Sequence, residues 1–434
     1  MAEQALQISL TVTPLVGAAL GLAFWSNPRR LKQWSLLVAI ASGLLLLGLA
    51  GRLTAPAENM LPLILLPIAA SLTLLGQPVH PDNRQAWLMT LALLGLGLGV
   101  LASHDRPGAI FLLVLFGLVA GLLYRYRAMS GSVPWWGIGT CGFGMIGLLL
   151  SLVAPPAVSA GALLMVCAIL LPLPPLHGGY VAAFRGLPGN LPAFLALLLP
   201  SLGFHRLVGV MPSLTEPLVE ALVLPAMAGM LYGSLKALTQ SRVRLLLAYA
   251  GLSFFSILWW YVAATRTVPP QAGVYLCSVG LATGGLLLAW HAIQARYGEV
   301  DLRAVTGLVY RMPRFAVLVS LLALAAMGLP PFGLFSGFLG MLLAPSLPRS
   351  GAWLVVLGAW LAASWYILDM AQGLLFGRQR SDLRYTDLRR AEVASLALCL
   401  LLLIALGLTP ARFFQPAIAT PQVRTAMESL SWNR

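Results

Sequence analysis

The sequence predicts an all-α, polytopic membrane protein of about 14 transmembrane helices, and three observations predict it. Hydrophobic residues make up 59% of the 434 residues, and the mean hydropathy is +0.88. Charged residues make up only 9%, whereas soluble domains contain about 25%. Continuous apolar runs recur along the whole chain, without the alternation that a transmembrane barrel requires. This composition excludes a soluble enzyme, a disordered chain and a disulfide scaffold.

The helices are expected where apolar runs approach the roughly 17–25 residues that a transmembrane helix needs. In chain order the runs are 8–25, 34–50, 60–76, 86–102, 109–123, 135–153, 157–173, 191–210, 217–235, 245–263, 272–289, 315–343, 352–370 and 391–408. A Pro155-Pro156 turn separates the sixth run from the seventh. The twelfth run is long enough to be a bent or broken helix. The longest loop, 371–390, has about 20 residues.

Basic residues divide unequally between the loops. Of the 27 lysines and arginines, 19 fall in loops that follow odd-numbered runs and eight in the other loops and the termini. The positive-inside rule therefore predicts a bacterial-type inner (cytoplasmic) membrane protein with both termini on the outer side. The first ten residues lack a basic n-region and a cleavage site, so we expect no cleaved signal peptide. The net charge of +14 then reflects cytoplasmic loops, and no nucleic-acid partner is expected.

Proline pairs interrupt two of the apolar runs. Pro174 and Pro175 lie at the end of the seventh run, and Pro330 and Pro331 lie within the twelfth. Proline lacks a backbone donor and clashes with the preceding helical turn, so each pair predicts a broken helix. Broken backbone inside a bilayer persists only where protein or a hydrated cavity covers it.

The two interruptions lie five runs apart, and this odd offset inverts the second relative to the first. The chain is therefore expected to divide into N-terminal helices (1–85), a five-helix repeat (86–210), an inverted repeat (217–370) and a C-terminal part with a basic loop, the last helix and an external tail (371–434). Paired broken helices in inverted repeats indicate an ion pathway in transporters. The alternative is that the prolines are ordinary kinks.

Three stretches then resemble the antiporter-like membrane subunits shared by complex I, membrane-bound hydrogenases and multisubunit cation/proton antiporters. The stretches are YGSLKALTQSRVRLLLAY (232–249), RYGEVDL (296–302) with the following Gly307-Leu308 and Met312-Pro313, and GLPPFGLFS (328–336). They are similar to the family patterns YGxxxALxQxDxKRLLAYSS, RYGTRDI…GGL…MP and PPFGLFxSEF. A weaker match is Pro175-Leu176-His177. The resemblance covers roughly 171–343 and implies 14 helices, external termini and inverted five-helix repeats.

The resemblance also implies a buried row of lysines, glutamates and a histidine that carries protons, and this chain departs from it. The family's lysine and aspartate in the second half of the first motif match Arg244 and Arg242 here. The remaining relay positions match apolar or neutral residues, near 117–120, near 199–201, at Val279 and Thr283, and at Gly337. Arginine effectively never releases its proton, so we expect the charged relay to be dismantled.

The remaining ionisable groups in or beside the runs are the candidate ion-pathway residues. They are Arg244, Lys236, His177, Glu220, Asp369 and His205. Such groups are expensive in a bilayer and are usually functional or paired. Each also has a simpler interpretation: Arg244 and Lys236 as cytoplasmic anchors, His177 as a cap for freed carbonyls, Glu220 and His205 as interfacial groups, and Asp369 as a partner of the basic loop 378–390.

The sequence gives no sign of redox or metal chemistry in the chain itself. The four cysteines lie in apolar runs without a CxxC pair, and no nucleotide, zinc or nucleophile motif stands out. We therefore expect no metal and no cofactor in this chain. The expected partners are the lipid bilayer and other membrane subunits of the same complex, including further antiporter-like subunits.

The function indicated is that of a non-catalytic, antiporter-like membrane-arm subunit in a proton-translocating oxidoreductase of the NADH-quinone oxidoreductase or membrane-hydrogenase type. The chain would contribute to proton translocation or to its structural scaffold. Two alternatives stay open. One is a partner subunit in a non-redox assembly, either a cation/proton antiporter or an ion-coupled uptake system, for example for inorganic carbon. The other is an inert assembly scaffold.

Overall fold

The computed structural model describes residues 2–49, 57–103, 105–131, 133–266, 268–298, 301–302, 305–343, 352–377 and 386–409. Within these ranges the fold consists of helices and connecting turns, with no strand. The helices are α1 (Ala2–Gly21), α2 (Pro28–Leu49), α3 (Ala57–Gly76), α4 (Arg84–Ala102), α5 (Asp105–Ser130), α6 (Trp135–Val153), α7 (Pro156–Leu170), α8 (Gly178–Gly186), α9 (Leu191–Val210), α10 (Glu216–Ala221), α11 (Val223–Leu238), α12 (Val243–Thr265), α13 (Pro270–Tyr297), α14 (Pro313–Ala326), α15 (Gly333–Leu342), α16 (Ala352–Leu375) and α17 (Arg390–Leu408).

The described chain is a polytopic membrane protein by the length and composition of its helices. Ten helical segments are long and apolar enough to cross a bilayer, and five shorter apolar helices accompany them. Large apolar side chains face outwards, including Val153 (83% exposed) and Trp365 (70% exposed). An apolar exterior of this extent would be unstable in water and is typical of contact with lipid.

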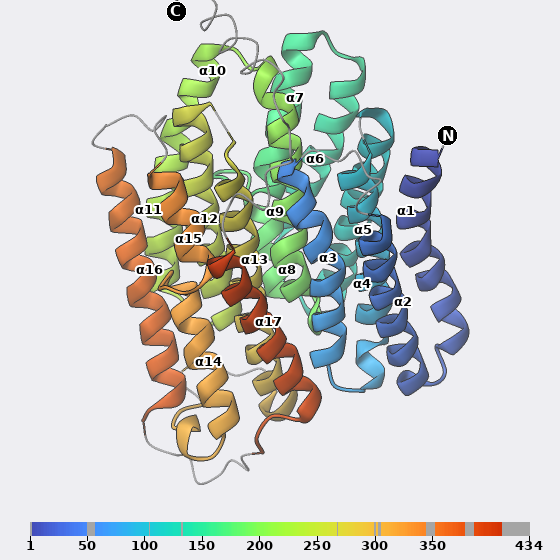
Figure 1. Ribbon diagram of the computed structural model, residues 1–434, viewed down its shortest axis with the longest axis vertical. Coiled ribbons are helices and arrows are strands. Elements are labelled where there is room, and N and C mark those ends of the chain that lie inside the picture. The colour runs from blue at the N-terminus through green and yellow to red at the C-terminus, as the bar shows by residue number, and fades with distance from the viewer. Residues whose placement is uncertain are drawn as a thin grey trace, which may run out of the picture.

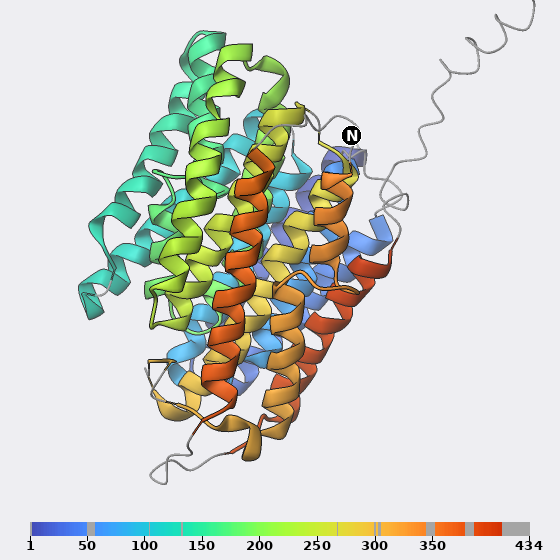
Figure 2. The ribbon, with the colours of Figure 1, turned by 90° about the vertical axis from the view of Figure 1, so that its left-hand side faces the viewer.

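The core lies around α12 and α13. In the most apolar 18-residue stretch of each helix, all residues of α13 and 89% of those of α12 are buried inside the protein. In α2, in α6 and in the segment formed by α10 and α11, only 33% of that stretch is buried. Helix α13 packs against α9, α15, α17, α3, α12 and α14. The helices form one elongated bundle, with α1 and α2 at one edge in Figure 1 and α6 and α7 at one edge in Figure 2.

Both proline-containing runs are interrupted in the structure, at about the middle height of the bundle (Figure 1). Helix α7 ends at Leu170 and α8 begins at Gly178. Helix α14 ends at Ala326 and α15 begins at Gly333. The bonds Pro174–Pro175 and Pro330–Pro331 are both cis. The pair α7–α8 runs from top to bottom in Figure 1, whereas α14–α15 runs from bottom to top, so the two broken helices are antiparallel.

The ninth run corresponds to one long apolar segment, Glu216–Leu238, which a turn at Leu222 divides into α10 and α11. Two expected bounds need correction. The thirteenth run does not end at residue 370, because α16 passes the exposed Asp369 side chain and continues to Leu375. The loop expected from residue 371 is correspondingly shorter, because Leu374 and Leu375 are each only 3% exposed and extend the packed face of α16.

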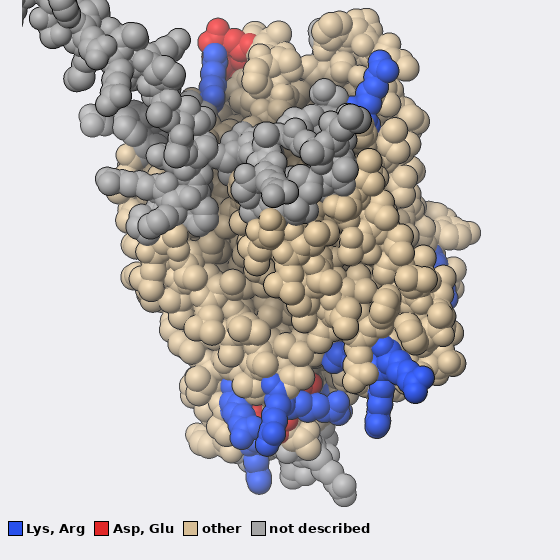
Figure 3. Space-filling view, turned by 45° about the vertical axis from the view of Figure 1, so that its right-hand side comes forward, with Lys and Arg blue, Asp and Glu red and all other residues tan. Residues whose placement is uncertain are grey.

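Basic side chains gather at one end of the bundle. Figure 3 shows many of them below a wide region with few charged side chains, while a red and blue cluster marks the opposite end. We call the first end the basic end: α11 finishes there, α12 begins there and α13 finishes there, with Lys236, Arg242 and Arg296 beside these termini. At the opposite end Arg266 bonds Glu216 (Nη2 to Oε1, 2.7 Å).

Candidate ion pathway

Neighbouring helices cover the backbone of the first break. The carbonyl of Leu171, released from helical bonding, accepts a hydrogen bond from Trp259 Nε1 of α12 at 3.0 Å. Helix α9 approaches through Gly203, where a Cβ atom would lie 2.4 Å from the backbone nitrogen of Leu171. Protein therefore satisfies and covers this part of the broken backbone, as a break at membrane depth requires.

The second break is covered in a similar way. Helix α17 passes it at Gly407, where a Cβ atom would lie 1.9 Å from the carbonyl oxygen of Pro331. The Ser336 hydroxyl donates to Gly333 O at 3.1 Å. The ring of Trp360 lies against Gly328, whose φ of +71° belongs to the left-handed region that glycine tolerates.

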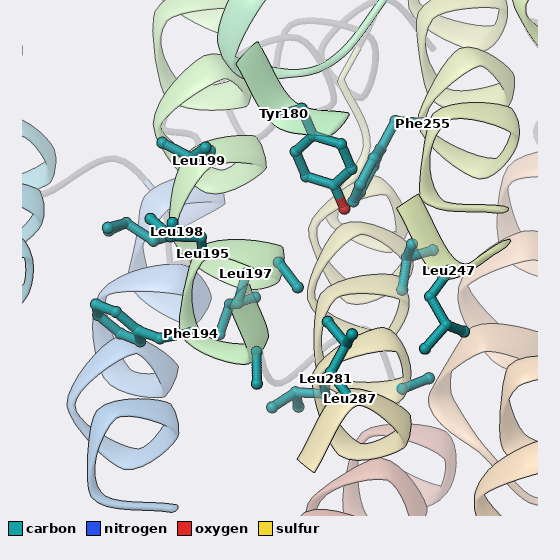
Figure 4. Close-up of a cluster of buried hydrophobic side chains, with 14 of the residues drawn as sticks. Tyr180, Phe194, Leu195, Leu197, Leu198, Leu199, Leu247, Phe255, Leu281 and Leu287 are labelled. Atoms are coloured by element: carbon teal, nitrogen blue, oxygen red, sulfur yellow. The ribbon is translucent and has the colours of Figure 1, made fainter. Parts of the chain in front are cut away.

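The interior between the breaks is apolar. Figure 4 shows a cluster of buried leucine and phenylalanine side chains on α9, α12 and α13, with Tyr180 of α8 beside Phe255. Leu195, Leu197 and Leu198 are at most 1% exposed, and Leu281 is 4% exposed. The segments 191–204, 245–265 and 270–290, which make up most of these three helices, contain no lysine, arginine, histidine, aspartate or glutamate. Their polar groups are neutral, so this region offers no charged relay.

Three positions matched to the relay are buried, and packing at one of them disfavours a charged side chain. Ser201 is 0% exposed on α9 and Thr283 is 6% exposed on α13, and Gly337 is buried on α15. At Gly337, a Cβ atom would lie 2.6 Å from the backbone nitrogen of Tyr275. An acidic side chain at position 337 therefore cannot be accommodated unless α13 and α15 separate.

Arg244 is the predicted site residue that the structure places in a polar cavity. The cavity holds about 230 Å³ at the basic end, and its lining includes Arg185, Arg242, Gln294 and Asp301. Arg244 Nε donates to Gln294 Oε1 at 3.0 Å, and its Nη1 donates to the carbonyl oxygen of Leu187 at 3.0 Å. Arg244 therefore lines the same cavity as Arg185 and Arg242. Lys236 is exposed on α11 and does not line the cavity.

His177 lies in the first break, half-buried among aromatic rings. Its ring meets Tyr232 of α11 edge to face at 5.4 Å between centroids, and Tyr249 of α12 lies 6.3 Å away. The two tyrosine rings are 6.0 Å apart. His177 therefore belongs to an aromatic cluster that ties the break to α11 and α12, and it does not line the arginine cavity.

The other predicted residues are scattered. Glu220 is 70% exposed and lies 3.8 Å from Arg266 in the ion-pair cluster opposite the basic end. Asp369 is exposed on α16; the arginines 378, 380 and 384 expected to pair with it lie outside the described residues. His205 is half-buried on α9. The described part of the chain therefore does not assemble the six candidates into one pathway.

Sequence reasoning missed a buried ion pair at the basic end. Arg296 of α13 and Glu392 of α17 are joined by bonds of 2.6 and 3.1 Å, and their side chains are 11% and 5% exposed. Arg296 also donates to the carbonyl oxygens of Ala292 and Asp387. The sequence signal for this pair is Glu392, an acidic residue at the start of an apolar run. The loop-charge count treats Arg296 only as a loop charge and does not pair it.

A related set of contacts holds the end of α3 near this pair. The last carbonyls of a helix lack intrahelical partners. Here Ser395 donates to Leu72 O at 2.8 Å, Asn190 donates to Thr73 O at 2.9 Å, and Lys32 Nζ donates to Leu75 O at 3.0 Å. Among the residues that the structure describes, no group of three histidine, cysteine, aspartate or glutamate side chains is placed to hold a metal ion.

Comparison with known proteins gives relatives over most of the chain. The chain is 30% identical over 336 residues to NADH-quinone oxidoreductase subunit 13 of Thermus thermophilus, covering 72% of this chain and 67% of that one. It is 26% identical over 375 residues to NADH-quinone oxidoreductase subunit N of Ectopseudomonas mendocina, covering 76% and 75%.

Solved structures show the same fold. A chain of respiratory complex I from Thermus thermophilus matches with a TM-score of 0.79 at 23% identity, covering 94% of this chain and 96% of that chain. A chain of the Mrp complex from Dietzia matches with a TM-score of 0.75 at 17% identity, covering 93% and 94%. The sequence profile described as NADH:quinone oxidoreductase/Mrp antiporter, transmembrane, matches residues 107–363. The chain belongs to this family, as an antiporter-like membrane subunit homologous to subunit N.

Proposed function

We propose that this chain is a membrane-arm subunit of a multisubunit proton-translocating oxidoreductase, in which it serves mainly as scaffold. Family membership supports the assignment, and the relatives named above are subunits of NADH-quinone oxidoreductases. The observation that carries the scaffold role is the apolar interior of α9, α12 and α13, where a proton relay would need titratable side chains. The chain itself holds no cofactor in this proposal, and redox chemistry belongs to partner subunits.

The proposal includes a finer topology. It counts 14 membrane crossings, with α7–α8, α10–α11 and α14–α15 forming one crossing each. Residues 86–210 and 217–370 form inverted repeats, which the opposite directions of the two broken helices support (Figure 1). Residues 1–85 and 371–434 flank them. The basic end faces the cytoplasm of a bacterial inner membrane, with both termini outside, because basic residues concentrate there.

The test compares proton pumping with assembly in the purified complex. Arg244 and His177 are replaced together by alanine, because Arg244 stands at the position of the family's motif lysine and His177 lies in the first break. The scaffold proposal predicts unchanged proton pumping per assembled complex in proteoliposomes. Loss of pumping in a fully assembled complex would show that these residues conduct and would overturn the scaffold role. Deleting the whole chain is expected to prevent assembly.

A second candidate is a subunit of a non-redox cation/proton antiporter or ion-coupled uptake complex. The likeness to a chain of the Dietzia Mrp complex favours it. Affinity purification followed by mass spectrometry distinguishes the two candidates. Co-purifying redox subunits support the oxidoreductase, whereas antiporter subunits alone, or a soluble zinc protein, support the non-redox assembly.

A further inference from the structure

The cavity at the basic end that Arg185, Arg242 and Arg244 line is partly open to solvent and concentrates positive charge. Arg185 comes from the last turn of α8, Arg242 directly precedes α12, and Arg244 lies in the first turn of α12. Asp301 supplies the one acidic side chain that lines the cavity. The lining therefore carries a formal excess of two positive charges, which attracts an anion.

Arg244 is held in a fixed orientation at the wall of this cavity. Its bonds to Gln294 Oε1 and Leu187 O use Nε and Nη1 and tie it to α13 and to the segment after α8. Arg185 and Arg242 are exposed and can turn towards a ligand. A guanidinium that is already oriented loses little side-chain entropy when it binds an anion.

The cavity lies at the level where the membrane-spanning helices end. Val243 begins the span of α12 and Tyr297 ends the span of α13. The first backbone amides of α12 lack intrahelical partners, and the helix dipole places partial positive charge beside the arginines. Phospholipid headgroups lie at this depth, and basic pockets between transmembrane helices bind anionic headgroups.

We propose that Arg185, Arg242 and Arg244 bind a phosphate group in this cavity. Guanidinium groups match phosphate oxygens with paired, charge-assisted hydrogen bonds, which a lysine ammonium cannot reproduce. The phosphate belongs either to an anionic phospholipid or to free inorganic phosphate, and the chemistry of recognition is shared. The site is independent of whether the chain conducts protons.

The experiment measures binding by the purified complex in nanodiscs. One arm compares retention of phosphatidylglycerol in mixed nanodiscs against pure phosphatidylcholine by native mass spectrometry. The other arm titrates inorganic phosphate by calorimetry. The test variant is Arg185→Gln with Arg242→Gln. Its matched control is Arg29→Gln with Arg30→Gln, which removes two exposed charges from the start of α2, outside the cavity.

The expected result is that the test variant binds about 25-fold more weakly, since each arginine near an anionic surface contributes about fivefold. The control should change less than twofold. Binding in the lipid arm alone identifies a headgroup, and binding in the phosphate arm identifies free phosphate. Absence of binding in both arms, or equal losses in test and control, overturns the proposal. Arg244→Lys keeps the charge and is expected to weaken binding, which separates specific recognition from general attraction.

Discussion

The centre of the bundle and its basic end contrast in how they hold the helices together. In the centre, α9, α12 and α13 meet through leucine and phenylalanine side chains and through glycines that touch neighbouring backbones. At the basic end an ion pair joins α13 to α17, and the side chains of Asn190 and Ser395 donate to free carbonyls at the end of α3. The interhelical ion pairs among the described residues therefore lie at the ends of the bundle, where charged groups are cheaper to place than at its centre.

This difference indicates that the features that hold the helices together are distinct from the titratable groups that proton conduction would need. The helix arrangement matches the family fold, yet the segments 191–204, 245–265 and 270–290 contain no lysine, arginine, histidine, aspartate or glutamate. A bundle of this kind needs packing, but it does not need a relay to remain folded. The free energy of unfolding is expected to depend most on the ion pair at the basic end, less on the closely packed glycines of the centre, and least on exposed surface charge.

The largest effect is expected from breaking the buried ion pair. Glu392→Gln leaves the Arg296 guanidinium buried without its anionic partner, which should lower the free energy of unfolding by about 3–5 kcal/mol. Thermal unfolding of the purified protein in detergent measures it. The double variant Arg296→Met with Glu392→Leu removes both charges and should recover most of the loss. A single variant that unfolds like the parent would show that the pair does not stabilise this end.

A smaller effect is expected at the tight glycines of the centre. Gly337→Ala places a methyl group against the backbone of Tyr275 and should destabilise the protein by about 1–3 kcal/mol. Gly117→Ala is the matched control, because no atom lies within 4 Å of its added Cβ. Alanine there should be neutral or stabilising by up to about 1 kcal/mol. Equal melting temperatures for the two variants would contradict the close packing inferred around position 337.

The fold was largely predictable because hydropathy reports directly on contact with lipid. Every predicted apolar run overlaps a helix or a pair of helices, and both proline pairs fall between helices. The bounds were less predictable: α16 continues past Asp369, because one outward-facing carboxylate does not interrupt backbone hydrogen bonding. The turn at Leu222 within the ninth run has a proline signal, because Pro225 cannot donate a helical hydrogen bond to the carbonyl oxygen of Ala221.

The contacts at the basic end were not predictable, because they join residues far apart in the sequence. Arg296 and Glu392 are separated by 96 residues, and Asn190 bonds a carbonyl 117 residues away. Counting loop charges predicts on which side of the membrane the charged groups lie but does not give their partners. Conversely, the missing relay side chains could be read from the sequence, since an absent lysine needs no structure to be noticed.

The smallest effect is expected at the cluster opposite the basic end. Glu220 is 70% exposed and 3.8 Å from Arg266, which already bonds Glu216 at 2.7 Å. Water and salt screen such a pair, so Glu220→Gln should change the free energy of unfolding by less than about 0.5 kcal/mol and leave proton pumping intact. Thermal unfolding at low and high salt, with pumping in proteoliposomes, checks both. A loss of pumping with unchanged stability would instead assign Glu220 to an ion path and bring titratable chemistry back to this chain.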